Sequence, residues 1–407
     1  MAIHVVDEAK RCIQCKVPKC REGCPIGTAV PDMMRDFLNN DLETAAKRLF
    51  ENNPLSLICS LVCDHDNQCE GHCILNRKGM PIHVSSVENY ISDACLDKLD
   101  LKPEASKNQK AAIIGAGPAG ITISILLALK GYGVTLFDSR DKIGGVLRYG
   151  IPAFRLPKSI LDRYHKLMVS LGIKIRPNTT IGGALTVDDL FRDGYAAVFI
   201  GTGVWRPKTL GIKGESLGNV HYAVDYLCNP DSYQLGERVA VIGAGNSAMD
   251  AARTALRQGV SKVTVYVRKA EVAASSREVD YAKIDGVEFE FCKVATELTE
   301  QGPIFKTVRY DEEGKVSDLP GSEQLYPADS IIIAISQGPK DKIVSTTTGI
   351  QVNRQGLVVT DTQGTTTRQG VFAAGDVVLG ARTVVEAVAY SKDVAAAMDA
   401  YMSGLPK

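Results

Sequence analysis

The sequence lacks an excess of charge of either sign. Its 407 residues carry 47 lysines and arginines and 47 aspartates and glutamates, so the formal net charge is zero. Nucleic acids and anionic membrane surfaces attract proteins with a strong basic excess. We therefore expect neither nucleic acid nor a membrane as the main partner.

The sequence also lacks segments that direct a chain into or across a membrane. Residues Met1 to Asp7 show no basic start followed by an apolar stretch, which is the pattern of a secretory signal. The longest mostly apolar run, Ile121 to Leu129, is far shorter than the roughly 20 residues of a membrane-spanning helix. Solenoid-type repeats and low-complexity tracts are absent as well. The expectation is a soluble, cytoplasmic protein.

Cysteine, by contrast, is abundant and unevenly placed. Eight of the eleven cysteines lie between Cys12 and Cys73. Because the cytosol keeps thiols reduced, this density indicates metal or cluster ligation rather than disulfides.

The eight cysteines form two groups with short internal gaps. The groups are Cys12-x2-Cys15-x4-Cys20-x3-Cys24, followed by Pro25, and Cys59-x3-Cys63-x5-Cys69-x3-Cys73. A run that ends in Cys-Pro is typical of bacterial ferredoxins, in which the fourth cysteine binds the other cluster of a pair. Four-cysteine zinc sites are commonly built from two Cys-x2-Cys pairs, and only one is present, so zinc is the weaker alternative.

After a polar linker, Leu101 to Lys110, short apolar strands alternate with helical patterns. We expect strands at residues 111–114, 134–137, 196–200, 239–242, 263–267, 331–335 and 371–374. Buried runs of this length between helices indicate parallel α/β sheets.

A dinucleotide-binding motif follows the first of these strands. Gly115, Gly117 and Gly120 precede a helix predicted over 121–129, and the next strand ends at Asp138. The first glycine permits a tight turn, the second lets the backbone approach a pyrophosphate, and the third allows the helix to pack closely. A carboxylate at Asp138 can bind a ribose. The combination of a strand, the glycines, a helix and a terminal acid indicates dinucleotide binding far more specifically than the glycines alone.

A second copy of the motif begins at Gly243 and Gly245 and continues through Asn246 and Ser247. Its following strand ends in Arg268-Lys269 rather than in an acid. Two cations there suit a 2′-phosphate, which favours NADP(H) over NAD(H). The alternative is that both cations are ordinary solvated surface charges.

The segment from Val371 to Asp376 resembles the second FAD fingerprint of flavoproteins with two dinucleotide domains. That resemblance implies FAD at the first glycine motif and a contact between Asp376 and the ribityl chain. The helix that opens at Thr383 and Val384 would stabilise negative charge on the flavin pyrimidine ring. The FAD domain would then be discontinuous, with the nicotinamide domain inserted.

The cysteine groups, the first glycine motif and the segment from Gly144 to Pro157 together resemble the glutamate synthase small-subunit family over essentially the whole chain. The layout is most similar to the flavin subunit of bacterial dihydropyrimidine dehydrogenase. The resemblance implies two [4Fe–4S] clusters, one held by Cys12, Cys15, Cys20 and Cys73, and the other by Cys24, Cys63, Cys69 and Glu88. One departure is Ser336, in Ala334-Ile335-Ser336-Gln337, where the family usually has glycine.

The expected fold class is α/β, with two Rossmann-like domains preceded by a helical iron–sulfur domain. The expected domains are residues 1–105 for the clusters, 106–225 with 340–407 for FAD, and 226–339 for NAD(P)H. The candidate cofactor-binding residues are Gly115, Gly117, Ala119, Gly120, Asp138, Gly145, Gly375, Asp376, Thr383 and Val384 for FAD, and Gly243, Gly245, Asn246, Ser247, Arg268 and Lys269 for the nicotinamide nucleotide.

The predicted activity is oxidation of NADPH by an FAD-dependent oxidoreductase that passes electrons through two clusters to a catalytic partner subunit or an electron-accepting protein. The alternatives are an NADH-specific subunit of a dihydropyrimidine dehydrogenase or ferredoxin:NADP oxidoreductase complex, and a non-catalytic redox scaffold. A disulfide reductase would need a close cysteine pair beside the flavin, and none follows residue 95.

Overall fold

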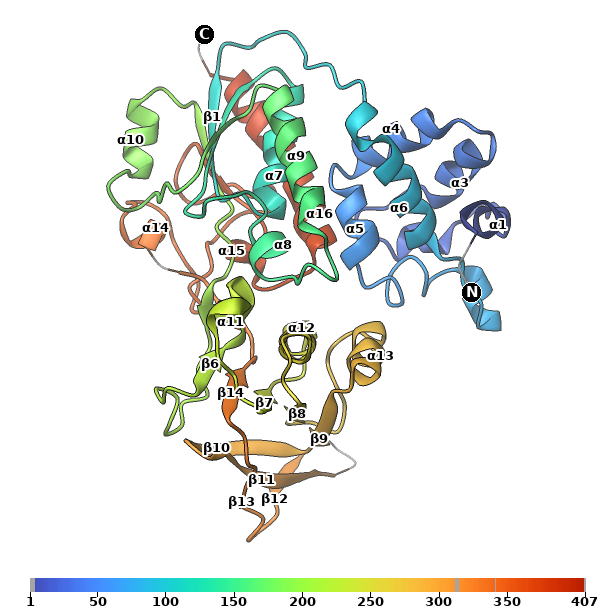
Figure 1. Ribbon diagram of the computed structural model, residues 1–407. Helices are drawn as coiled ribbons and strands as arrows, with labels where there is room; N and C mark the ends of the chain where they lie inside the picture. Colours follow the sequence, from blue (N-terminus) through green and yellow to red (C-terminus); the bar gives the residue numbers. More distant parts are fainter. Residues whose placement is uncertain (1–3, 312–314, 341, 406–407) are drawn as a thin grey trace. The chain divides into compact units, whose positions relative to one another are not determined.

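The computed structural model describes residues 4–311, 315–340 and 342–405 (Figure 1). The chain folds into two compact units. The first comprises residues 1–148, 153–204 and 339–407, and the second comprises residues 149–152 and 205–338. Within the described ranges, no helix combines the length and the apolarity needed to cross a membrane.

The first unit begins with a helical region that contains both cysteine groups. Its helices are α1 (Val5–Lys10), α2 (Lys19–Glu22), α3 (Val30–Leu38), α4 (Leu42–Asn52), α5 (Ser56–Val62) and α6 (Val84–Cys95), with 3-10 turns at Ile74–Lys78 and Leu96–Lys98. Met33, Leu49 and Ile91 are fully or almost fully buried in its core. α4 begins at Asp41, whose carboxylate accepts a hydrogen bond from the Thr44 amide at 3.1 Å.

The rest of the first unit surrounds a five-stranded parallel sheet in the order β16-β4-β1-β2-β3. The strands are β1 (Lys110–Ile114), β2 (Gly133–Phe137), β3 (Lys174–Arg176), β4 (Ala197–Ile200) and β16 (Val371–Ala373). Its helices are α7 (Pro118–Leu129), α8 (Val146–Tyr149), α9 (Lys158–Ser170), α10 (Val187–Arg192), α14 (Lys342–Ser345), α15 (Asp376–Leu379) and α16 (Val384–Ser403). Because β16 pairs with β4, the C-terminal segment completes a sheet that the N-terminal half begins.

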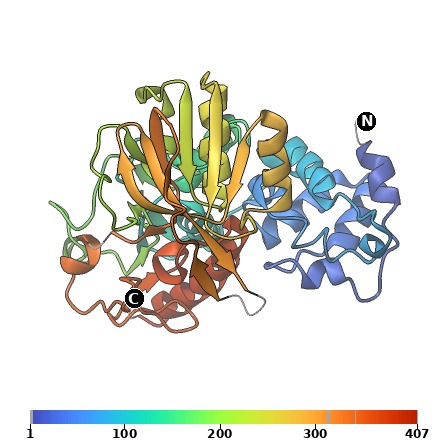
Figure 2. The ribbon, with the colours of Figure 1, turned by 90° about the horizontal axis from the view of Figure 1, so that it is seen from below.

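The second unit repeats this plan with the parallel order β6-β14-β7-β8-β9 (Figure 2). Its strands are β6 (Val220–Tyr222), β7 (Arg238–Ile242), β8 (Lys262–Val267), β9 (Glu288–Phe291) and β14 (Ser330–Ile333), and its helices are α11 (Ala223–Cys228), α12 (Asn246–Arg257) and α13 (Ser276–Asp285). An antiparallel sheet is built from β10 (Lys293–Thr299), β11 (Gly302–Tyr310), β12 (Val316–Asp318) and β13 (Gln324–Leu325), and β5 (Arg206–Pro207) pairs with β15 (Gln337–Gly338).

All seven strands expected from the sequence are present within two residues of their predicted ends. The α/β class with parallel sheets is therefore confirmed. The main part of the second unit starts at residue 205, ahead of residue 226, where the sequence placed the domain boundary. The reason is that β5 pairs with β15 and β6 pairs with β14, so both strands belong to the second unit.

Within the first unit, the cysteine-bearing helices dock onto α9 and α16. The Tyr164 hydroxyl, on α9, is fully buried and donates to the carbonyl of Pro54 at 2.9 Å. Arg163 forms ion pairs with Asp93 and Asp97. Lys392, on α16, donates to the Asn52 carbonyl at 2.6 Å, and burial lowers the pKa of Lys392. These contacts hold the cysteine region against the part of the first unit that contains the five-stranded sheet.

A cluster of polar side chains fastens the last turns of α16. Asp399 accepts hydrogen bonds from Lys107 at 2.9 Å, Lys130 at 2.6 Å and the Tyr132 hydroxyl at 2.7 Å. Burial raises the pKa of Asp399, but the bonds from Lys130, Lys107 and Tyr132 outweigh it and hold the pKa well below the usual range. The charged carboxylate therefore ties the C-terminal helix to the start of the sheet.

We predict that Asp399→Asn lowers the free energy of unfolding by about 2 kcal/mol at neutral pH, since hydrogen bonds to a charged group are lost. The folded pKa of Asp399 lies below that of the unfolded chain, about 3.9. The parent protein should therefore exceed the variant in free energy of unfolding by the full amount above about pH 5, and this difference should shrink as the pH falls below 4. Urea denaturation across this range measures it, and a difference that does not change with pH would contradict the assigned charge.

Candidate cofactor sites

Three segments of the first unit converge on the first glycine loop. Gly117 caps the N-terminus of α7, and the Gly144 amide donates to the Ala116 carbonyl at 2.8 Å. Gly145 has φ +52°, and a Cβ atom added there would lie 2.7 Å from the Gly117 Cα. Only glycine satisfies both the backbone angle and this close approach. The amides at the start of α7, including those of Ala119 and Gly120, are left for an anionic ligand.

Asp138 braces the same loop. Its carboxylate accepts hydrogen bonds from the Ala116 amide at 2.6 Å and the Arg140 amide at 2.7 Å. Burial raises the pKa of Asp138, although both of these bonds lower it. The side chain assigned to a ribose thus also holds the turn in shape.

The C-terminal segment is the third segment that approaches the first glycine loop. A Cβ atom on Gly375, where φ is +75°, would lie 3.2 Å from the Cβ of Ala119. Asp376 is mostly shielded and accepts from the Arg382 amide at 3.2 Å, and burial raises the pKa of Asp376 to about 6. Thr383 caps α16 in a reciprocal capping box with Glu386, so Val384 is its first helical residue. The structure therefore brings the candidate FAD residues together.

The second glycine loop lies in the second unit. The Gly243 amide donates to the Tyr266 carbonyl at 3.2 Å, while the surroundings of Gly245 are open. The loop is held by the following segment, because the Asn246 side chain accepts from the Ser275 amide at 3.0 Å. Ser247 lies in the first turn of α12.

The cations after β8 are available for a ligand. Arg268 and Lys269 are both exposed directly after the strand ends at Val267. Arg277, in the first turn of α13, is half-buried. Ser336, at the glycine position of the family, adopts φ +96°. The backbone thus keeps a glycine-like conformation even though the residue has changed, at a cost of order 1–3 kcal/mol.

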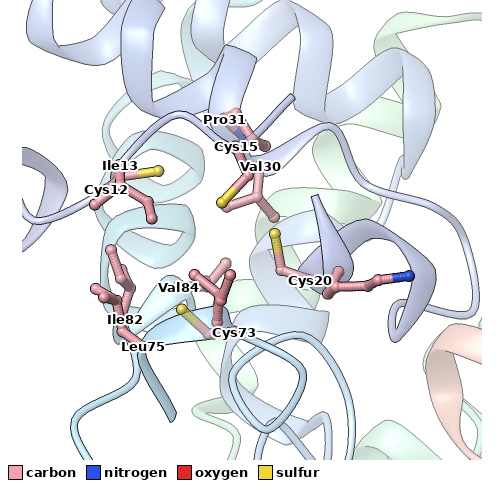
Figure 3. Close-up of a pocket in the computed structure, with 12 residues that line it drawn as sticks. Cys12, Ile13, Cys15, Cys20, Val30, Pro31, Cys73, Leu75, Ile82 and Val84 are labelled. Atoms are coloured by element: carbon pink, nitrogen blue, oxygen red, sulfur yellow. The ribbon is translucent and has the colours of Figure 1, made fainter. Parts of the chain in front are cut away.

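The first candidate cluster site is a pocket whose lining includes Cys12, Cys15, Cys20 and Cys73 (Figure 3). Their sulfur atoms face a common space, and most other lining residues are apolar. Burial and the charges of the neighbouring Cys73 and Cys12 together raise the pKa of the Cys20 thiol to about 11. Four thiolates at such a place need positive charge, which the iron of a cluster supplies.

The second candidate site contains Cys24, Cys63, Cys69 and Glu88. Burial raises the pKa of the Cys69 thiol, as do the charges of Glu88, Glu70 and Cys24. Glu88 is only 7% exposed. Burial raises its pKa to about 8, with Glu70 adding to the shift. A hydrogen bond with Cys59, burial and the charges of Glu88 and Cys69 raise the pKa of the Cys63 thiol well above its usual range. The four candidate residues therefore lie near one another, and their donor set suits an iron–sulfur cluster.

All eleven cysteines are free thiols. Among the described residues, no three or more His, Cys, Asp or Glu side chains converge closely enough to hold a single metal ion. In a four-iron cluster each thiolate binds a different iron atom, so the sulfur atoms stand farther apart than around one ion. That the described residues form no such single-ion site therefore agrees with a four-iron cluster rather than with zinc.

Sequence reasoning missed two buried residues beside these sites. Glu70 accepts from the Ser85 amide at 2.9 Å and the Ser85 hydroxyl at 2.6 Å, which caps the start of α6. The charges of Cys59 and Glu88 contribute to the raised pKa of Tyr164, which burial mainly causes. Tyr164 thus lies near the second site. Neither residue belongs to a motif, and both act through contacts between distant segments.

Comparisons with known proteins distinguish the cysteine region from the rest of the chain. Residues 109–391 match the family model of the pyridine nucleotide-disulphide oxidoreductases, and residues 2–99 match that of dihydropyrimidine dehydrogenase domain II with a 4Fe–4S cluster. The glutamate synthase [NADPH] small chain of Halomonas elongata is 34% identical over 94% of this chain and 87% of its own. That of Azospirillum brasilense is 33% identical over 97% and 88%.

A solved structure, thioredoxin reductase of T. acidophilum, aligns with a TM-score of 0.57 over 72% of this chain and 99% of that protein. At 22% identity this likeness concerns the fold alone.

Fold and site together define an oxidoreductase of the pyridine nucleotide-disulphide class with an added 4Fe–4S domain. Its cofactors are FAD, a nicotinamide dinucleotide and iron–sulfur clusters of the 4Fe–4S type, whose number per chain is treated below. The chain belongs to the glutamate synthase small-chain family.

We predict that Gly145→Val abolishes retention of FAD, because a side chain there collides with the backbone of Gly117. Gly172→Val is the matched control, since Gly172 has a similar φ of +78° but no atom within 4 Å of an added Cβ. Flavin absorbance per chain after gel filtration measures the outcome. Equal flavin content in both variants would contradict the assigned role of the close approach.

Proposed function

We propose that this chain is the electron-input subunit of a larger enzyme, in which it oxidises NADPH and passes single electrons to a partner chain. One observation carries the proposal. The FAD-type loop and both cysteine sites belong to one compact unit, in which helices of the cysteine region pack against α9 and α16. A relay needs such fixed proximity, whereas a redox scaffold has no use for two complete dinucleotide loops.

In this proposal the residues of the first loop bind and orient FAD. The amides at the start of α7 bind the pyrophosphate, Asp138 a ribose, and Asp376 the ribityl chain. The N-terminus of α16, capped by Thr383, stabilises negative charge on the flavin ring. FAD, when bound, supplies the conversion between hydride transfer and single-electron transfer. No side chain needs to act as an acid or a base.

The nicotinamide nucleotide would bind at Gly243, Gly245, Asn246 and Ser247, with Arg268 and Lys269 on the 2′-phosphate. Both cations are exposed, and β8 brings them to the carboxyl edge of the sheet, where dinucleotides bind in this fold. This favours NADPH. NADH specificity is the alternative, in which the two cations remain solvated.

Two [4Fe–4S] clusters are proposed, with the ligand sets inferred from the sequence. The second set adjoins Tyr164 of α9 and so faces the FAD-type sheet, whereas the first set opens toward the surface between exposed residues. We infer that the site of Glu88 would hold the cluster nearer the FAD-binding sheet and the site of Cys12 the cluster nearer the surface.

The acceptor belongs to a partner subunit. This is supported by the relatives, which are small chains of a synthase and therefore work together with another chain. We place the complex in the cytoplasm, where the free thiols of the cysteine region remain reduced.

Anaerobic titration tests the electron-input role. About eight iron atoms per chain are expected, as two four-iron clusters require. NADPH should bleach the flavin and reduce the clusters at lower concentration than NADH does. Arg268→Ala/Lys269→Ala should remove about tenfold of that preference, or roughly 1.4 kcal/mol. Failure of both nucleotides to bleach the flavin would reject the proposal. An unchanged preference for NADPH in the variant would show that Arg268 and Lys269 are solvated and do not bind the 2′-phosphate.

A second prediction concerns the carboxylate ligand. Glu88→Gln keeps an oxygen donor and should retain about eight irons, while Glu88→Leu should lose about four, since [4Fe–4S] clusters need a fourth ligand. The matched control is Glu43→Leu on α4, an exposed carboxylate outside both sites. Iron content and the EPR spectrum give the result. Full iron in Glu88→Leu would exclude Glu88 as a ligand.

A further inference from the structure

The surface around the first cysteine site differs from the rest of the chain in charge. Residues 10–22 and 73–80, which carry all four cysteines of that site, contain seven lysines and arginines and a single acidic residue, Glu22. The chain as a whole is neutral, with 47 residues of each sign. The basic excess is therefore local and concentrated at one site.

Several of these cations are free to meet a partner. Lys16, Arg77 and Lys78 are exposed, and none of the three takes part in an ion pair with another described residue. Lys19 is different, because it pairs with Glu22 at 2.6 Å. Unpaired cations beside a site attract negatively charged molecules and speed their encounter.

Apolar side chains are exposed among the same cations. Ile13, Val17, Ile74 and Met80 are 59%, 67%, 43% and 64% exposed. Ile13 and Ile74 line the pocket itself, and each directly follows a cysteine of the site. Exposed apolar groups bordered by charge are typical of protein–protein contacts. We call these four residues with Lys16, Arg77 and Lys78 the cluster rim.

The backbone of the cluster rim is held in place. The Arg11 guanidinium donates to the carbonyl of Met80 at 2.6 Å and to that of Pro81 at 3.3 Å, and it pairs with Glu8 at 2.7 Å. Glu8 also accepts from the His83 amide at 2.8 Å. This network joins the segment before Cys12 to the segment after Cys73. A preorganised surface loses little entropy when a partner binds.

We propose that the cluster rim is the docking surface for an acidic protein that accepts one electron at a time. The inference rests on the proposed function, because it assigns the outlet of the same relay. The positive charge favours an acidic partner over a basic one, and the apolar side chains favour a protein over a small anion. Each NADPH would deliver two electrons, one at a time, to the acceptor of this partner and release NADP⁺ and one proton.

The test compares two protein acceptors of opposite charge, an acidic plastocyanin and a basic cytochrome c. The NADPH-reduced holoprotein is mixed with each in a stopped-flow instrument at low and high salt. Arg77→Glu/Lys78→Glu should slow plastocyanin reduction by about tenfold or more at low salt and weaken its salt dependence. The same variant should speed cytochrome c reduction.

Two further variants separate docking from other effects. Lys47→Glu/Lys102→Glu reverses two exposed charges outside the cluster rim and should leave both rates near those of the parent protein. Met80→Ser should raise the KM for plastocyanin without changing its salt dependence, because only apolar contact is lost. In every variant NADPH should bleach the flavin at the parental rate, and the EPR-monitored cluster potentials should not change.

The outcomes distinguish this inference from the proposed function. If NADPH reduces flavin and clusters but Arg77→Glu/Lys78→Glu changes neither acceptor rate, the docking surface is wrong and the electron-input role stands. If the variant and the Lys47→Glu/Lys102→Glu control slow plastocyanin equally, the effect is one of net charge and the docking surface is again wrong. If NADPH reduces neither flavin nor clusters in the parent protein, the proposed function itself fails, and the outlet with it.

Discussion

The burial of thiols and of a carboxylate at the cysteine sites is the constraint on which the first unit depends. Burial raises the pKa values of Cys20, Cys69 and Glu88, so these groups resist ionisation in the protein alone. Iron reverses this preference, because a bound cation stabilises thiolate and carboxylate charge. Polar contacts between distant segments also hold the short helices around the cysteines, among them the bonds of Glu8 and Glu70 to the start of α6. We therefore expect the assembly of the proposed clusters to be coupled to the folding of this region.

A second constraint, the separation of the proposed redox cofactors, accounts for the contacts that hold the cysteine region against the sheet of the first unit. Electron transfer between cofactors requires short, constant separation, which a flexible tether does not provide. Tyr164 and Lys392 each bond to a carbonyl of the cysteine region, at Pro54 and Asn52. Because the acceptors are backbone carbonyls, they remain when the residue is substituted. These contacts therefore require a particular backbone position but not a particular side chain at Pro54 or Asn52. The linker from Leu101 to Lys110 only needs to connect two parts that other contacts have already joined.

The sequence predicted the elements well and the contacts between them poorly. Strands such as β1 and β7 were recognisable because parallel strands covered on both faces are continuously apolar. The glycines of both loops were recognisable because their spacing has a local physical cause. The approach of Gly145 to Gly117 and the place of Tyr164 beside Glu88 depend on residues far apart in the chain, and no local pattern encodes them. The start of the second unit at residue 205 was not recognisable because β5 and β6 are only two and three residues long.

The two glycine loops show how one backbone solution can serve two ligands. Both begin with a glycine whose amide donates to the strand beside it, Gly115 to Phe137 and Gly243 to Tyr266. They differ in the residue that ends this second strand. Asp138 turns back and fixes its loop through the Ala116 amide, whereas Arg268 is exposed. The loop before Arg268 is instead held from outside by Ser275, which donates to Asn246. Because bracing no longer depends on the strand-end residue, that position is free to carry the positive charge that a 2′-phosphate requires.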